Sequence, residues 1–213
     1  MFDFNSDMAQ EFGVYKNEQA YEIAKYMSSV NISAGFLAGD AIAIKNAMAF
    51  VKENNLALGA HIGYQDISGF GRRDMDLADD EIEAMVIYQV GAISAYAKTM
   101  GLEIEHVRCH GAMNIKLANN IEFAKSVASA VKKINPWLNL YITNPEMKKL
   151  LEDEIQINCP YEVTFGENMS IRQLREMDIV PETIHFKDLE SAIRAYDVIK
   201  PTPVNYNRVS GQI

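Results

Sequence analysis

The chain has 213 residues, of which 48% are apolar, and it carries a formal net charge of −9. This length and composition predict one globular domain with a sizeable core, and the negative charge argues against a nucleic-acid or anionic-membrane surface. The chain shows no apolar run of membrane-span length, no signal-peptide pattern and only two cysteines, so we expect a cytoplasmic protein.

Strand and helix patterns alternate about seven times along the chain. Short apolar runs predict strands at 3–6, 30–33, 56–61, 104–109, 138–142, 155–163 and 183–186. The most regular helix pattern runs from Ile82 to Ala97, after three acidic residues that suit a helix N-terminus. Further helices are expected at 21–28, where the pattern is weak, after Asp40, through Ile121 to Val131, after Asn144 and after Asp188.

This alternation predicts an α/β fold with a parallel sheet, either a (β/α) barrel or a doubly wound open sheet. The chain has neither a G-x-G-x-x-G after its first strand nor a G-x-x-x-x-G-K-[ST] motif, so neither dinucleotide nor P-loop binding is supported. A single barrel of seven strands is favoured, because strand ends converge on one face of a barrel and polar residues follow many strands: Asp7, Asn31, His61, His110, Asn144, Glu162 and His185. We assign residues 1–200 to the barrel domain. Residues 201–213 are assigned to a C-terminal tail that is poorly ordered or packed on a partner.

Two chemistries are open for the polar strand ends. Asp7, His61 and His110 could ligate a divalent metal, since neutral imidazole and carboxylate suit Zn²⁺ and similar ions. The sequence has no H-x-x-x-H or H-E-x-x-H spacing, so we assign no metal ligand. The same groups suit acid/base catalysis, in which a histidine carries protons and Asp7 or Glu162 holds a water. We therefore expect Asp7, His61, His110 and Glu162 to be catalytic.

Arginines accompany these groups. His106, Arg108 and His110 alternate along one strand and share a face, on which we expect Arg108 to approach the barrel mouth and His106 to be an interior polar group. Arg72 lies in a glycine-containing loop and could clamp a substrate carboxylate, or else form a solvated salt bridge with the acidic residues that follow it. We expect substrate contacts from Arg72, Arg108, Asn31 and Asp66.

Four ordered segments resemble the LamB/YcsF family. Residues 3–8, D-F-N-S-D-M, resemble the family's D-L-N-C-D-L-G-E, and residues 31–40, N-I-S-A-G-F-L-A-G-D, resemble N-I-A-C-G-F-H-A-G-D. Residues 59–73 contain G-A-H-I-G-Y-Q-D and G-F-G-R-R, which resemble the family's G-A-H-P-G-Y-x-D and G-F-G-R-R. Residues 106–113, H-V-R-C-H-G-A-M, resemble H-V-K-P-H-G-A-L-Y. Four motifs in matching order coincide far less often than one, so the combined match is specific.

The resemblance implies a barrel of the glycoside hydrolase/deacetylase type. It also implies a hydrolase that acts on a cyclic amide, as the A-like subunit of a 5-oxoprolinase complex that opens the lactam of 5-oxoproline to L-glutamate. The reaction needs ATP, with Mg²⁺ as a candidate ion. Because the chain has no nucleotide motif, ATP would act through separate B- and C-type subunits.

The chain also departs from the family pattern. Leu37 stands where the family has a histidine, Ser6 and Ala34 replace cysteines, and Gln10 replaces a glutamate. The match fades beyond residue 150. Two alternatives therefore stay open: a diverged, non-catalytic subunit of a related complex, and a stand-alone metal-dependent amide hydrolase of the deacetylase type.

Overall fold

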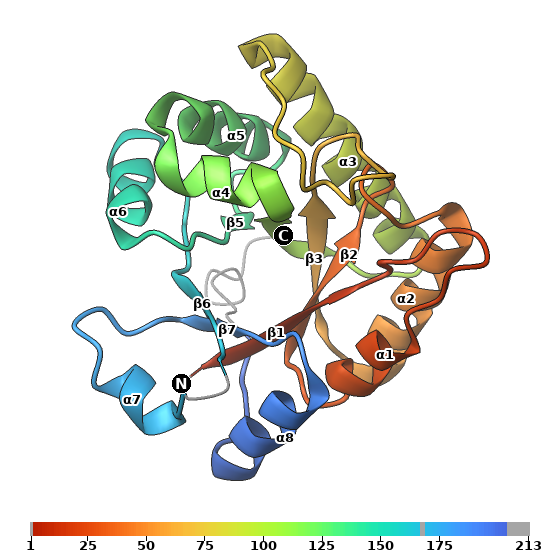
Figure 1. Cartoon of the computed structure of the whole chain (residues 1–213). Helices are drawn as coiled ribbons and strands as arrows, with labels where there is room; N and C mark the ends of the chain where they lie inside the picture. The colour runs from red at the N-terminus through yellow and green to blue at the C-terminus, as the bar shows by residue number, and fades with distance from the viewer. Residues whose placement is uncertain (1, 167–168, 204–213) are drawn as a thin grey trace.

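A computed structural model describes residues 2–166 and 169–203 (Figure 1). The strands are β1 (Asp3–Met8), β2 (Ser29–Ser33), β3 (Ala57–Ile62), β4 (Ile104–Cys109), β5 (Asn139–Leu140), β6 (Glu162–Thr164) and β7 (Thr183–His185). The helices are α1 (Glu18–Ala24), α2 (Ala41–Asn54), α3 (Asp79–Thr99), α4 (Gly111–Asn119), α5 (Ile121–Ile134), α6 (Pro145–Glu154), α7 (Ile171–Arg175) and α8 (Leu189–Val198).

In the described part of the chain, seven strands form one parallel sheet in the order β5-β4-β3-β2-β1-β7-β6. The sheet curls until its two edges meet, where Ile142 forms a parallel bridge with Tyr161 and Glu162 N donates to Ile142 O. Helices surround the curled sheet (Figure 1). The predicted seven-stranded (β/α) barrel is confirmed, and the described residues do not form an open doubly wound sheet.

Most strand residues are buried on both faces of the sheet, and apolar and polar residues alternate along several strands, as in S-V-N-I-S of β2. Every residue of β2 and β3 is buried. The face toward the helices is apolar, whereas the face toward the barrel interior carries polar side chains that bond to one another. Gly59 is required on this inner face, since a Cβ atom there would collide with the His106 ring.

Helix caps follow the sequence pattern. Asn144 Oδ1 accepts from the backbone N–H groups of Glu146 and Met147 at the start of α6, and Asp188 accepts from Ser191 N at the start of α8. Asp40 accepts from Ile42 N and Ala43 N at the start of α2. The apolar stripe predicted for 82–97 is the buried face of α3. These local predictions are confirmed because a cap bond and a buried stripe involve residues close in sequence.

Two helices, α4 and α7, are absent from the sequence prediction. α4 begins directly after His110, which makes no side-chain cap bond, and only Ala112, Met113 and Leu117 are buried in it. α7 has five residues, too few for a periodic signal. β6 is much shorter than predicted, and Glu162 begins it rather than ending it.

The predicted tail lies outside the described residues except for 201–203, where Thr202 N donates to Phe2 O. The division into a barrel domain and a tail at residue 200 stays a prediction. Among the described helices, none combines the length and the apolar character needed to cross a bilayer.

Candidate active site

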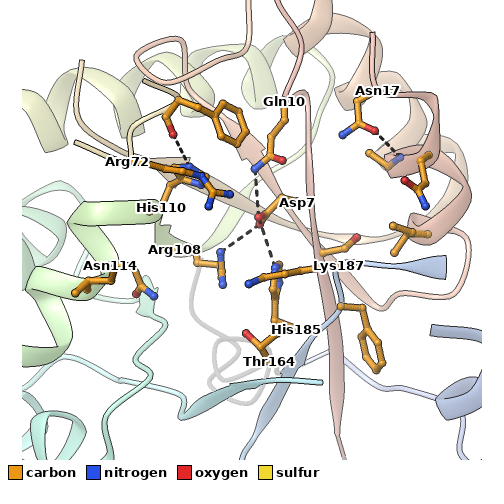
Figure 2. A pocket seen from close by; sticks show the side chains of 18 residues that line it. Asp7, Gln10, Asn17, Arg72, Arg108, His110, Asn114, Thr164, His185 and Lys187 are labelled. Atoms are coloured by element: carbon orange, nitrogen blue, oxygen red, sulfur yellow. Dashed lines mark hydrogen bonds and ion pairs between the residues drawn. The ribbon is translucent and has the colours of Figure 1, made fainter. Parts of the chain in front are cut away.

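The carboxyl ends of the strands surround a pocket of about 420 Å³ (Figure 2). β1 supplies Asp7, β4 supplies Arg108, and β7 supplies His185. The loop after β3 contributes Phe70 and Arg72. The pocket is lined by polar side chains from strands, loops and α4: Asp7, Gln10, Asn17, Arg72, Arg108, His110, Asn114, Thr164, His185 and Lys187. This convergence at one face is the usual place for chemistry in a barrel.

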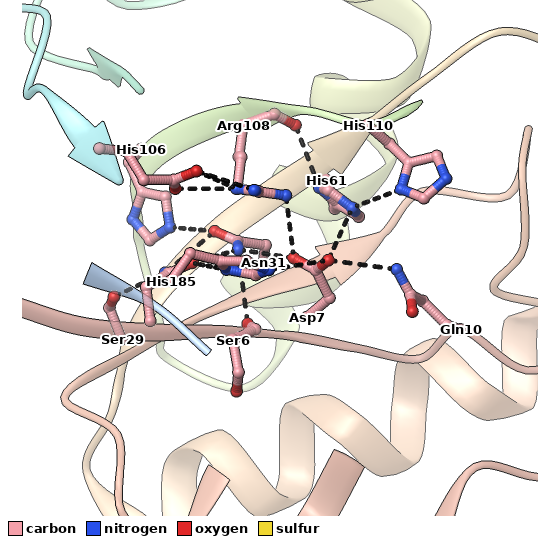
Figure 3. Close-up of polar contacts among 12 residues, drawn as sticks. Ser6, Asp7, Gln10, Ser29, Asn31, His61, His106, Arg108, His110 and His185 are labelled. Carbon is pink, nitrogen blue, oxygen red and sulfur yellow. Dashed lines mark hydrogen bonds and ion pairs between the residues drawn. The ribbon is translucent and has the colours of Figure 1, made fainter. Parts of the chain in front are cut away.

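Asp7 is the centre of the polar contacts (Figure 3). Its Oδ1 accepts from Asn31 Nδ2 at 2.8 Å and lies 3.4 Å from Arg108 NH1. Its Oδ2 accepts from Gln10 Nε2 at 3.3 Å and lies 3.3 Å from His61 Nε2 and 3.5 Å from His185 Nε2. Burial raises the pKa of Asp7, but the nearby His61, Arg108 and His185 outweigh it, so the pKa falls well below its usual value. Asp7 is therefore ionised.

His61 and His110 meet beside Asp7, with His61 Nε2 lying 3.0 Å from His110 Nδ1. Their other ring nitrogens point at backbone carbonyls, since His61 Nδ1 lies 3.2 Å from Arg108 O and His110 Nε2 lies 2.8 Å from Phe70 O. Burial lowers the pKa of His110 to about 3, so this ring is neutral near pH 7. With its one proton donated to Phe70 O, His110 has no proton to offer a carbonyl oxygen.

Arg108 lies between two carboxylates. Its Nε and NH2 donate to both oxygens of Glu162 at 2.8–3.1 Å. Burial lowers the pKa of the guanidinium, but Glu162 and Asp7 raise it further, so it stays charged. Burial likewise raises the pKa of Glu162, and Arg108 lowers it below the usual value. Glu162 is an ionised partner of Arg108 with both oxygens engaged by it.

The remaining two histidines belong to the interior polar network. His106 Nε2 lies 2.7 Å from Asn31 Oδ1, and its ring stacks on Tyr141 with centroids 4.3 Å apart. His185 Nδ1 lies 3.2 Å from Asn5 Oδ1. Burial lowers the pKa of His106 to about 3 and that of His185 to about 4. His106 is thus the satisfied interior group that its place on β4 predicts.

The structure brings some of the expected site residues together and separates others. Asp7, Arg72, Arg108 and His110 line the pocket, and His61 lies directly behind Asp7. Three other expected residues are outside its lining: Asn31, Asp66 and Glu162. Asn31 and Glu162 are turned inward to other side chains.

Asp66 bonds instead to its own loop. Its carboxylate accepts from Arg73 and from Gly69 N, and it lines a separate hollow beside β3. The arginine loop therefore does form a salt bridge, but through Arg73. Its partner is Asp66 and not the acidic residues that follow the loop. Arg72 is left exposed at the pocket, with its guanidinium 5.6 Å from the Phe70 ring.

Some pocket residues escaped the sequence reasoning. Gln10, which the sequence marks only as a departure from the family pattern, and Lys187 lie in loops after β1 and β7, so their place after strand ends was the available signal. Asn114 lies on α4, a helix that the pattern does not predict, and it carries no such signal.

Comparison with known proteins agrees with this architecture. The model of the LamB/YcsF family matches residues 2–164. The chain belongs to the LamB/YcsF family. Its similarity to the A subunit of 5-oxoprolinase from Bacillus cereus (strain 03BB102) is 40% identity over 139 residues, 65% of this chain and 55% of that protein. With the A subunit of 5-oxoprolinase from Pyrococcus abyssi (strain GE5 / Orsay) it shares 36% identity over 161 residues, 76% of this chain and 63% of that protein. The chain thus spans less than two thirds of these curated relatives.

A solved LamB/YcsF-type structure has the same fold. The crystal structure of a lactam utilization protein from Thermus thermophilus superposes with a TM-score of 0.84 and 27% identity, over 92% of this chain and 94% of that one. The similarity therefore extends past residue 164, into the part of the chain where the sequence motifs fade.

In this LamB/YcsF chain, Leu37 packs beside the histidine pair. It is buried, and its side chain lies against Gly63 and Gly71, where added Cβ atoms would also approach His110. An apolar group therefore stands close to His110, at the position where the family pattern has a histidine.

Proposed function

We propose that the chain is the A-like subunit of a 5-oxoprolinase complex and takes part in the ATP-dependent hydrolysis of 5-oxoproline to L-glutamate. The observation that carries the proposal is the ionised Asp7 at the floor of a pocket whose rim holds exposed cations. Relatives named as the A subunit of 5-oxoprolinase, together with a structural neighbour described as a lactam utilization protein, support this choice of substrate class.

Lactam opening adds water across the amide bond, so the site must hold a water and stabilise negative charge on the carbonyl oxygen. Asp7 lines the pocket, and its carboxylate is positioned to orient the attacking water. Arg108 contacts Asp7 and also lines the pocket, so it is suited to stabilise the oxyanion. Glu162 holds the guanidinium of Arg108 in place and acts as a positioning residue.

The substrate also carries a carboxylate. Arg72 and Lys187 line the pocket as exposed side chains, and a guanidinium can bind a carboxylate through two parallel hydrogen bonds. We assign the carboxylate to Arg72, because its backbone lies in the loop that also supplies the Phe70 carbonyl to His110.

ATP must be handled by partner subunits in this proposal. The sequence lacks a P-loop motif. Besides Arg108, the described lining of the pocket includes two cationic side chains, Arg72 and Lys187, both at its rim. We therefore propose B- and C-type partner subunits, with Mg²⁺ accompanying the nucleotide in them. A cytoplasmic site of action remains part of the same proposal.

The decisive experiment is glutamate formation from 5-oxoproline by the chain reconstituted with B- and C-type subunits and Mg-ATP. We expect turnover that depends on ATP and on this chain. His61→Ala should lower kcat about 100- to 1,000-fold, because it removes a group in contact with Asp7. Thermal unfolding of the variant checks that it folds.

Leu37→His separates an active site from a vestigial one. If wild type turns over no faster than His61→Ala and activity appears only with Leu37→His, this chain is a diverged, non-catalytic subunit. Hydrolysis of simple amides by the chain alone, without ATP, would instead support a stand-alone hydrolase.

A further inference from the structure

Three ligand atoms converge at the inner wall of the pocket: Asp7 Oδ2, His61 Nε2 and His110 Nδ1. Within the described residues, this is the group of histidine, cysteine and acidic side chains whose ligand atoms all lie within 4.8 Å of one another. Figure 3 shows His61 between Asp7 and His110, with both neighbours approaching the same ring nitrogen. The cluster draws on β1, β3 and the residue after β4, so it exists only because the barrel is formed.

The hydrogen bonds around the two rings determine where their lone pairs point. A carbonyl oxygen can only accept, so the nitrogens facing Arg108 O and Phe70 O carry the protons. In a neutral imidazole the other nitrogen is then unprotonated. The lone pairs of His61 Nε2 and His110 Nδ1 therefore face each other and Asp7 Oδ2. Backbone carbonyls fix metal-binding histidines in this way in many proteins.

The spacing of these atoms matches a shared ion. His61 Nε2 lies 3.0 Å from His110 Nδ1 and 3.3 Å from Asp7 Oδ2. Two ligands that each lie about 2.0–2.2 Å from one ion are roughly 3 Å apart. Without a cation, three lone-pair atoms at these distances repel one another.

We propose that Asp7, His61 and His110 bind one divalent transition-metal ion, through Asp7 Oδ2, His61 Nε2 and His110 Nδ1. Two imidazoles and one carboxylate form a donor set typical of catalytic zinc, so we commit to zinc as the fitting ion. Asp7 and His110 line the pocket, which leaves the remaining coordination positions open toward it. Leu37 is buried near Gly63 and Gly71, the glycines that His110 also approaches, and its apolar side chain offers no ligand atom.

The ion would polarise a water or carbonyl oxygen in the pocket. This catalytic role rests on the proposed function, whereas the binding site itself does not. The competing explanation of the geometry is a second proton on His61, which would then donate from Nε2 to His110 Nδ1 and pair with Asp7. The two explanations differ in a direct observable, the binding of zinc by the isolated chain.

The test is a titration of the full chain with ZnCl₂ by calorimetry, after dialysis against a chelator. We expect one equivalent bound in the micromolar range or tighter, and a rise in Tm with zinc. His61→Ala and His110→Ala should each weaken binding by at least about 100-fold, since loss of an outer partner alone costs 10- to 100-fold. The matched control is His106→Gln, a buried histidine on β4 outside the cluster, which should bind zinc as wild type does.

A wild-type Kd weaker than about 100 µM would overturn the proposal in favour of the protonated His61. Equal zinc binding by wild type and both alanine variants would also overturn it, because the ion would then sit elsewhere. If an alanine variant fails to fold, the zinc affinity of Asp7→Asn is measured in its place. A loss of affinity in Asp7→Asn, together with a zinc-dependent rise in the Tm of wild type, would then support the site. In the reconstituted complex, ATP-dependent turnover by zinc-free protein with Mg²⁺ restored would refute the catalytic role and leave the proposed function standing. If the chain binds zinc but the reconstituted complex shows no turnover, the proposed function is refuted and the zinc site stands.

Discussion

At the scale of single residues, the interior of this barrel depends on how charges are paired. Arg108 is 7% exposed and Glu162 is 1% exposed, and Asp7 lies on the other side of the guanidinium. The buried Glu162 and the partly buried Asp7 face one buried guanidinium, so one negative charge is left over at the pocket. A cation bound at the pocket would balance it.

Glu162→Gln should lower the free energy of unfolding by about 3 kcal/mol, because it leaves the Arg108 charge buried and only partly paired. Urea unfolding of the isolated chain measures this. The matched control is Glu176→Gln, which breaks an exposed pair with Arg172 on the surface and should leave the stability close to that of wild type. Equal effects of the two substitutions would show that the interior pair is solvated.

Arg72→Ala should raise KM for 5-oxoproline by about 10- to 100-fold with little change in kcat, because a carboxylate contact is made equally in ground and transition states. Steady-state kinetics of the reconstituted complex separates the two constants. Arg172→Ala, an exposed arginine on α7, is the control that should leave both unchanged. A fall in kcat at constant KM would assign Arg72 to the reaction rather than to binding.

At the scale of elements, short polar side chains connect neighbouring helices as well as cap them. Asn144 accepts from two N–H groups of α6 through Oδ1, and its Nδ2 donates to Ala118 O on α4 at 2.8 Å. One amide therefore sets the start of α6 and its position relative to α4, the helix that carries Asn114 and follows His110.

Asn144→Ala should destabilise the chain by about 1–2 kcal/mol, since both the cap and the link to α4 are lost. Asn144→Asp keeps the cap but cannot donate to Ala118 O, so its effect should be intermediate. Thermal or urea unfolding ranks the three proteins. If Asn144→Asp is as damaging as Asn144→Ala, the link between the helices outweighs the cap.

At the scale of the whole molecule, Asp3 joins the barrel strands at the end opposite to the pocket. Its carboxylate accepts from Ser28, Ser29, Tyr141 and Thr183 at 2.7–3.4 Å, and these residues come from the β2, β5 and β7 regions. Burial nevertheless raises the pKa of Asp3 to about 6, against the lowering effect of the four hydroxyls.

This pKa predicts how stability depends on pH. Between pH 4 and 6 the folded chain holds a proton on Asp3 that the unfolded chain has released, so the free energy of unfolding falls as pH rises. The loss from this group should reach about 3 kcal/mol by pH 7. The buried neutral histidines act in the opposite direction, because they resist protonation as pH falls.

The measurement is therefore the difference between wild type and Asp3→Asn in urea unfolding from pH 4 to 7. Relative to wild type, the variant should gain stability steadily as pH rises through 6. Asp153→Asn, at an exposed position of α6, is the control. A constant difference across this range would show that Asp3 titrates alike in the folded and unfolded chains.

The sequence by itself determined the order of the strands and of most helices, the barrel, the helix caps at Asp40, Asn144 and Asp188, and the family. It also placed Asp7, His61 and His110 at strand ends, which a barrel must bring to one face. These are consequences of local periodicity and of a topology with few alternatives.

Only the tertiary structure decided which polar groups face the pocket and which face each other. The sequence placed Asn31 and Glu162 at strand ends, as it did Asp7, but Asn31 lies in the middle of β2 and Glu162 begins β6. Asn31 bonds to side chains 24 and 75 positions away, and Glu162 bonds to one 54 positions away, so both face other side chains instead of the pocket. Gln10, Asn114 and Lys187 reach the pocket from loops and from a helix without a pattern. The lone pairs of His61 and His110 are set by carbonyls of Arg108 and Phe70, 47 and 40 positions away. Such hydrogen bonds form between segments that meet only when the sheet closes, and no local pattern encodes them.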